Sequence, residues 1–343
     1  MNIIELHDSV WKRLQARRDR LPHALLLIGQ RGLGKFQLAR AFAAGLLCEQ
    51  STADGRACGQ CLACGWHSQG NHPDFRLLQP EALVDSEGEG DDAKDGKKKA
   101  SQQITIDQVR GLDEFLGIGT HRAGLRIVIV YPAEAMNRST ANALLKTLEE
   151  PAPDTLFLLV SNEPLRLLPT IRSRCQAVPV GLPPTERVLA MLVDAGVSDP
   201  AHWLALAGGA PILATELAQS GQGGWLEQLV GRLAAGGKGD ALASSADVDK
   251  LLRDSKGKVG LRQVVEWTQK WVVDLVLARQ RLPVRYFARH QATISALVEM
   301  AAVEKLLRFH RHLLQVRRQV EQPLNARLFL EELFLDYRVL FAE

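Results

Sequence analysis

The strongest constraint on the fold is a glycine-rich segment between an apolar run and a helical pattern. Residues 24–28 read Ala-Leu-Leu-Leu-Ile, a continuous apolar run that is typical of a strand buried on both faces of a parallel sheet. The run leads into Gly29-Gln-Arg-Gly-Leu-Gly-Lys35, and apolar residues then recur at helical spacing from Leu38 to Leu46. A G-x-x-x-x-G-K pattern in this position predicts a phosphate-binding loop, built from Gly29, Gly32, Gly34 and Lys35.

Strand and helix signatures alternate through roughly the first 180 residues. Asp107 is expected to be the N-cap of a helix that runs through Phe115, and a second helix is expected at Ser139–Glu150, before Pro151. This order predicts an α/β fold with a parallel sheet. Further strands are expected at Phe75–Leu78, Ile127–Val130, Leu156–Val160 and Ala177–Val180.

Pro183 and Pro184 mark the predicted end of this domain, because the strand signature does not recur beyond them. A small helical unit is expected next, followed by a helical bundle with amphipathic stretches at Val264–Leu277, Ile294–Leu314 and Asn325–Phe341. Within the first domain, low apolarity and blocks of opposite charge predict a disordered surface insertion at 81–101. The predicted domains are 1–180, 181–220 and 221–343.

The loop lacks the usual magnesium ligands. Position 36 is Phe where Ser or Thr coordinates the ion, and Val130 is followed by Tyr131-Pro132 instead of an acidic residue. Glu134, the nearest carboxylate, comes too late in the chain to replace it. The sequence therefore predicts no ATP hydrolysis. Nucleotide binding without turnover and a loop retained only for packing both stay open.

Four of the five cysteines form a metal-binding pattern. Cys48, Cys58, Cys61 and Cys64 lie within seventeen positions and supply four thiolates, the ligand set that zinc holds in a tetrahedral cage. A complete cage leaves no open position, so the predicted zinc is structural. Free thiols are the alternative, and His67 or His72 could replace one cysteine. Cys175 is remote from the cluster and is expected in the core.

Composition sets only broad limits. A net charge of +3 is too small to indicate nucleic-acid binding by itself. No apolar run approaches the roughly 20 residues that span a bilayer, and the first residues lack the pattern of a signal peptide. A cytoplasmic protein is expected, and in that reducing compartment a cysteine cluster favours metal over disulfides.

Ile171-Arg172-Ser173-Arg174-Cys175 is a short basic turn, whose ordinary interpretation is a solvated pair of arginines near a helix end. Together with Leu21–Ile28, the four cysteines and Asn142–Pro151, however, it resembles the delta-prime family of bacterial clamp-loader AAA+ subunits of DNA polymerase III. Asn142–Pro151 and Ser173–Cys175 are the most specific of these segments. Pro323–Leu328 resembles the C-terminal end of the same family, so the resemblance covers nearly the whole chain.

The resemblance implies a AAA+ domain with a RecA-like sheet, a small helical lid and a C-terminal collar within a five-subunit ring. It assigns Arg174 as an arginine finger that acts in trans on ATP bound to a neighbouring motor subunit. The implied partners are gamma or tau motor subunits, a delta subunit, the sliding clamp and primed DNA. Motor subunits carry Ser or Thr after the loop lysine and an acidic pair after the third strand, so Phe36 and Tyr131 favour a non-hydrolysing stator.

Two rival interpretations stay open. One is an active motor ATPase of the same family, which would show magnesium-dependent turnover that requires Lys35. The other is a zinc-containing adaptor that binds DNA alone, with a salt-dependent affinity that requires Cys61 and Cys64.

Overall fold

The computed structural model describes residues 2–84, 100–121, 124–255, 257, 259–320 and 324–342, which form two compact units, Met1–Arg187 and Val188–Glu343. The first unit contains five parallel strands in the order β2-β3-β4-β1-β5. Each predicted strand is confirmed to within one residue at either end. The strands are β1 Ala24–Ile28, β2 Phe75–Leu78, β3 Arg126–Val130, β4 Thr155–Ser161 and β5 Gln176–Pro179.

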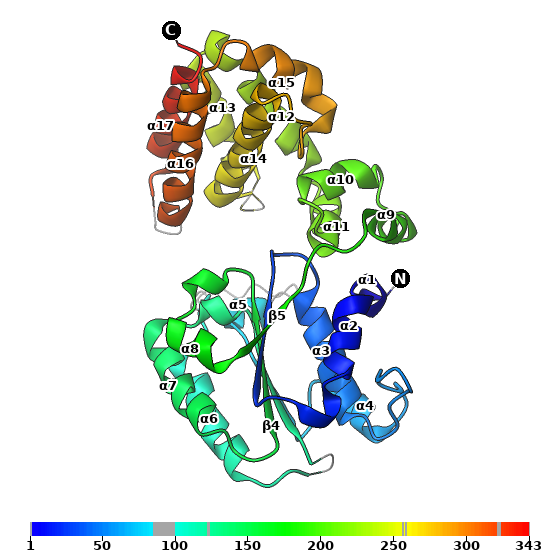
Figure 1. Cartoon of the computed structure of the whole chain (residues 1–343). Coiled ribbons are helices and arrows are strands. Elements are labelled where there is room, and N and C mark those ends of the chain that lie inside the picture. The colour runs from blue at the N-terminus through cyan, green and yellow to red at the C-terminus, as the bar shows by residue number, and fades with distance from the viewer. Residues whose placement is uncertain are drawn as a thin grey trace. The chain divides into compact units, whose positions relative to one another are not determined.

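Helices cover both faces of this sheet (Figure 1). On one face α3 (Lys35–Leu47) packs against β1, β3 and β4. On the other face Leu26, Val128 and Phe157 share a core with α6 (Ile106–Gly117), α7 (Arg138–Glu149) and α8 (Pro169–Arg174). Strands covered on both sides need apolar residues at every position, which explains the continuous apolar runs. The remaining helices of this unit are α1 Ile3–Leu6, α2 Asp8–Gln15, α4 Leu62–Ser68 and α5 Glu81–Val84.

Two local predictions for the first unit are wrong. The N-cap of α6 is Thr105 rather than Asp107, because Thr105 and Gln108 form a reciprocal capping box. The predicted disordered insertion begins too early, since residues 81–84 form α5 and the Ala82 N–H donates to the Ser101 carbonyl (3.1 Å). Residues 85–99 of that insertion lie outside the described residues.

The second unit is helical, with no strand among its described residues. The predicted stretch Ile294–Leu314 is interrupted at residues 299–302, and no Gly or Pro marks that break in the sequence. In the described part of the chain, no helix is both long and apolar enough to cross a membrane. The division into a lid and a collar stays a prediction. The helices are α9 Thr185–Asp194, α10 Pro200–Leu206, α11 Pro211–Gln219, α12 Gly223–Ala234, α13 Ala241–Asp254, α14 Leu261–Arg279, α15 Gln291–Val298, α16 Val303–Gln319 and α17 Ala326–Val339, with α9 starting just before the unit boundary.

Buried polar groups join three helices of the second unit. The Trp271 indole N–H donates to the Tyr337 hydroxyl (2.9 Å), which donates to the Leu233 carbonyl (2.8 Å). These bonds connect α14, α17 and α12. Nearby, the buried carboxylate of Asp274 accepts backbone N–H groups from residues 285–287 and so orders the turn after α14.

Candidate functional site

The phosphate-binding loop lies between β1 and α3, as predicted. Gly32 and Gly34 have φ values of +80° and +84°, which residues with a side chain rarely adopt. A Cβ atom at Gly29 would lie 2.4 Å from the Val180 carbonyl oxygen, so this position also excludes a side chain. Lys35 is the first residue of α3. The glycines are therefore required by the backbone geometry of the loop.

The Lys35 ammonium is already paired within the chain. Its Nζ donates to the Gln30 carbonyl (2.6 Å) and to Asn162 Oδ1 (2.8 Å), and its side chain is buried. Burial lowers the pKa of Lys35 to about 8, opposed by the nearby Glu134 carboxylate. These two bonds use two of the three ammonium N–H donors, so one donor is left for a phosphate oxygen.

Aromatic rings occupy the sequence positions of the magnesium ligands. The Phe36 and Tyr131 rings stack with centroids 4.4 Å apart and planes inclined by 12°. Glu134 Oε1 accepts the Asn162 backbone N–H (3.0 Å), while its buried Oε2 has no hydrogen-bond partner among the described residues. The site thus presents a ring stack where oxygen ligands would be needed.

Two residues of this loop network were not predicted. Asn162 follows β4, and because β4 pairs with β1, its side chain reaches the loop across the same sheet edge. His7 Nε2 donates to the Leu33 carbonyl (2.6 Å), and burial lowers the pKa of this imidazole. The position of Asn162 after a buried strand was a usable signal. Nothing in the local sequence marks His7.

The four predicted cysteines gather into one cluster. Their sulfur atoms lie within 4.8 Å of one another, with Sγ–Sγ distances of 3.8 Å for Cys48–Cys61 and 3.9 Å for Cys58–Cys64. Tetrahedral ligands with zinc–sulfur bonds of about 2.3 Å would lie about 3.8 Å apart. None of the four forms a disulfide bond. The cluster could therefore hold a metal ion without rearrangement.

Backbone N–H groups point at these sulfur atoms, which favours thiolates. Bonds from Gln60 and Cys61 lower the pKa of the Cys58 thiol to about 6. Burial instead raises the pKa of Cys64 to about 12, so this thiol needs a cation to ionise near neutral pH. The chemistry of the donor set thus fits a bound metal.

The histidines considered as alternative ligands do not belong to the cluster. The His67 ring packs against Phe75 with centroids 4.8 Å apart. His72 Nδ1 accepts the Asp74 backbone N–H (3.1 Å). All four metal ligands can therefore be cysteines. Cys175 is partly buried against the core beneath α8, and burial raises its pKa to about 11.

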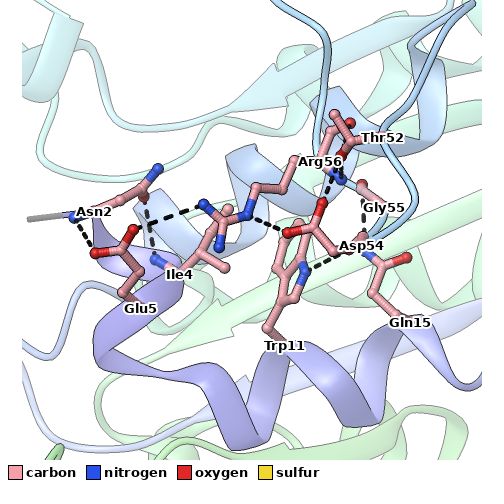
Figure 2. Close-up of polar contacts among 9 residues, drawn as sticks. All are labelled: Asn2, Ile4, Glu5, Trp11, Gln15, Thr52, Asp54, Gly55 and Arg56. Carbon is pink, nitrogen blue, oxygen red and sulfur yellow. Dashed lines mark hydrogen bonds and ion pairs between the residues drawn. The ribbon is translucent and has the colours of Figure 1, made fainter.

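The chain between Cys48 and Cys58 forms a loop that packs on the N-terminal helices (Figure 2). The Trp11 indole N–H donates to the Asp54 carbonyl (2.9 Å), and the Gln15 amide donates to the Gly55 carbonyl (3.4 Å). Arg56 forms two ion pairs, with its Nε 2.6 Å from Asp54 Oδ2 and its Nη1 3.8 Å from Glu5 Oε1. The cysteine module is therefore attached to α1 and α2 as well as to α3.

We expect Gly45→Ala in α3 to lower the free energy of unfolding by about 1–3 kcal/mol, although Ala favours helix more than Gly. A Cβ atom there would lie 2.2 Å from the Gly55 carbonyl oxygen, a backbone atom that cannot rotate away. The matched control is Gly231→Ala in α12, where nothing lies within 4 Å of the added Cβ. Urea denaturation should show the control stabilised by about 0.5–1 kcal/mol. A neutral Gly45→Ala variant would contradict this packing.

Arg174 is the last residue of α8. Its Nη1 donates to the Thr170 carbonyl (3.0 Å), and its Nη2 lies 2.6 Å from Glu149 Oε1 at the end of α7. The side chain keeps 34% of its surface exposed. Within the described part of the chain, these contacts do not connect Arg174 to the phosphate-binding loop.

A further cluster lies between α16 and α17, where ligand atoms of His312, Glu332 and Asp336 fall within 4.8 Å of one another. His312 Nε2 is 3.4 Å from Asp336 Oδ2, and both side chains are substantially exposed. A surface ion pair accounts for this arrangement.

Comparison with known proteins identifies the family. A family model described as "DNA polymerase III, delta subunit" matches residues 7–183, and one described as "DNA polymerase III, delta subunit, C terminal" matches residues 243–338. A DNA polymerase III subunit delta' of Pseudomonas aeruginosa is 34% identical over 98% of this chain and 97% of its own length. The chain belongs to the DNA polymerase III delta' family.

Similarity to other members of this group is more local. The delta' subunit of Bacillus subtilis is 36% identical over 51% of this chain and 47% of its own length. The tau/gamma subunit of Haemophilus influenzae is 32% identical over 46% of this chain and 20% of its own length. The predicted fold class for this delta' family member, an α/β P-loop domain followed by helical domains, is confirmed.

Proposed function

We propose that this chain is a non-hydrolysing clamp-loader subunit that helps to place the sliding clamp on primed DNA. In this function it joins gamma or tau motor subunits and a delta subunit in a hetero-pentameric ring, in which the motors consume ATP. Membership of the delta' family supports the assembly. The stack of Phe36 on Tyr131 is the observation that carries the non-hydrolysing role.

Hydrolysis of ATP requires a magnesium ion that bridges the terminal phosphates and neutralises developing charge. The phenyl ring of Phe36 has no oxygen to offer, and Tyr131 stands where an acidic residue would follow β3. Lys35 is held by the Gln30 carbonyl and Asn162 Oδ1 and keeps one N–H donor for phosphate. Nucleotide binding without turnover and a loop retained for packing therefore both agree with this geometry.

We expect Lys35→Met to leave the ATPase rate of the reconstituted loader within twofold of wild type, because this loop does not turn over ATP. The matched control is the same change at the loop lysine of a motor subunit, which should remove hydrolysis at that site. Steady-state phosphate release with clamp and primed DNA measures both. Magnesium-dependent turnover by the purified chain, lost in Lys35→Met, would instead favour the motor ATPase.

Arg174 supports the second part of the proposal. Its guanidinium is a permanently charged planar fork that matches phosphate oxygens, and it remains accessible on the surface of the first unit. In this role Arg174 contacts ATP held by the neighbouring motor subunit, while its own subunit contributes no hydrolysis.

Exposed apolar side chains on the last two helices support the collar assignment. Leu335 is 46% exposed and Val339 58% exposed on α17, and both lie on the same face as Leu328. On α16, Leu307 and Leu314 are exposed at a seven-residue spacing. Apolar surface of this kind is suited to helical packing between subunits.

We expect Leu335→Glu to weaken assembly with the other subunits by at least about tenfold, since a charge would be buried in the collar. The control is Leu282→Glu, because Leu282 is similarly exposed (52%) but follows α14. Analytical ultracentrifugation of the mixed subunits gives the distribution of complexes. Equal assembly of the two variants would remove α17 from the interface.

The cysteine cluster is proposed to hold one structural zinc ion. Its four thiols would fill a tetrahedral coordination sphere and leave no position for substrate. A solitary zinc-containing DNA adaptor is the remaining rival. It would require salt-dependent DNA affinity in the isolated chain, lost when Cys61 and Cys64 are replaced, whereas the clamp-loader proposal expects stable DNA engagement only in the complete ring.

A further inference from the structure

We infer that Glu149 is a positioning residue for Arg174, which holds the guanidinium in one orientation before a neighbouring subunit's nucleotide reaches it. The inference rests on the proposed finger role of Arg174. The contact itself is short, with 2.6 Å between Arg174 Nη2 and Glu149 Oε1. A second hydrogen bond, from Nη1 to the Thr170 carbonyl (3.0 Å), holds the other arm of the fork.

The position of Glu149 in α7 indicates that its pairing with Arg174 is not incidental. It is the last residue of α7, and Glu150 follows as the C-cap. The C-terminal end of a helix carries partial negative charge, so carboxylates there are unfavourable. Among the described residues, Glu150 shows no ion pair, whereas Glu149 is compensated by Arg174. Glu149 thus places a negative charge beside Arg174 at a helix end where a carboxylate is otherwise unfavourable.

Both anchors of the contact are rigid. Leu148 precedes Glu149 and Ile171 lies in α8 with Arg174, and both are buried in the same core beneath the sheet. Helices α7 and α8 pack directly on each other. The Thr170 carbonyl and the backbone of Glu149 therefore have fixed positions, and the two bonds restrict the arginine between them to few rotamers.

The two contacts leave the Arg174 guanidinium able to bind phosphate. A guanidinium has five N–H donors, and the two contacts occupy one donor on each terminal nitrogen. The remaining donors carry no contact in the described part of the chain, and the side chain is one-third exposed. Because ordering a flexible side chain costs free energy at the moment of binding, an arginine ordered in advance engages phosphate more effectively.

The test compares variants in the reconstituted loader with clamp and primed DNA. Glu149→Ala should lower kcat for ATP about threefold to tenfold, with unchanged KM and unchanged ring assembly, because only the engaged transition state needs the ordered finger. Glu149→Gln should stay within twofold of wild type, since its amide oxygen still accepts the Arg174 N–H. Glu150→Ala, the neighbouring carboxylate, should be unchanged. Arg174→Ala measures the contribution of the arginine finger itself to kcat.

Each result decides the matter. A Glu149→Ala rate equal to or above wild type, with Arg174→Ala impaired, overturns the positioning role and leaves the finger role intact. Equal losses in Glu149→Ala and Glu149→Gln overturn it too, because charge rather than hydrogen-bond geometry would then matter. An unimpaired Arg174→Ala variant removes the finger role and the positioning role together.

Discussion

Arg174→Ala should reduce ATP hydrolysis at the adjoining motor site by about 10³-fold, the lower end of the effect of an arginine supplied in trans. The guanidinium stabilises charge that develops on the transferred phosphoryl group, and no other residue in the described part of α8 combines its terminal position with its exposure. Folding should be unaffected, because a half-exposed ion pair with Glu149 contributes little to stability. Phosphate release and clamp loading by the reconstituted complex measure the effect.

Two further variants sharpen that result. Arg174→Lys keeps the charge but loses the planar fork, so most of the activity should still be lost. Arg166→Ala removes another arginine near α8, one that pairs with Glu163, and should leave turnover unchanged. Unchanged hydrolysis in Arg174→Ala would show that the adjoining site is completed by a different subunit.

Replacing Cys61 and Cys64 together by Ser should lower the zinc content from about one ion per chain to none and unfold the cysteine module. Structural zinc sites carry apparent binding free energies of about 10–16 kcal/mol, which become folding free energy for the segment they close. The docked loop should then detach from Trp11 and Gln15, which exposes Arg56 to trypsin. Elemental analysis and limited proteolysis give the two readouts.

The control for this pair is Cys175→Ser, because Cys175 lies outside the cluster and should leave zinc content unchanged. Acidification should also release the ion. Zinc needs thiolates, and protons compete with the metal for the four sulfur atoms as the pH falls. A zinc-free preparation with a protease-resistant module would refute a structural metal.

The strands, the loop and the cysteine ligands were predictable because each depends on short-range patterns. Residues 24–28 show their double burial as an unbroken apolar run, and the spacing of the loop glycines is itself the loop geometry. The N-cap of α6 was predictable as well, since Thr105 and Gln108 have the capping-box spacing, but Asp107 was favoured on residue type alone. The break between α15 and α16 has no such marker, because packing rather than a Gly or Pro sets it.

Sequence by itself determined which magnesium ligands are missing and which thiols can share a metal, because residue type and spacing decide both. Only the tertiary structure decided which contacts occupy the place of the missing magnesium ligands. Lys35 meets Asn162 across 127 positions of chain, and the stack of Phe36 on Tyr131 forms because parallel strands bring their carboxyl ends to one edge. The pairing of Arg174 with Glu149 likewise depends on two helices packed over one core, a relation that no local pattern encodes.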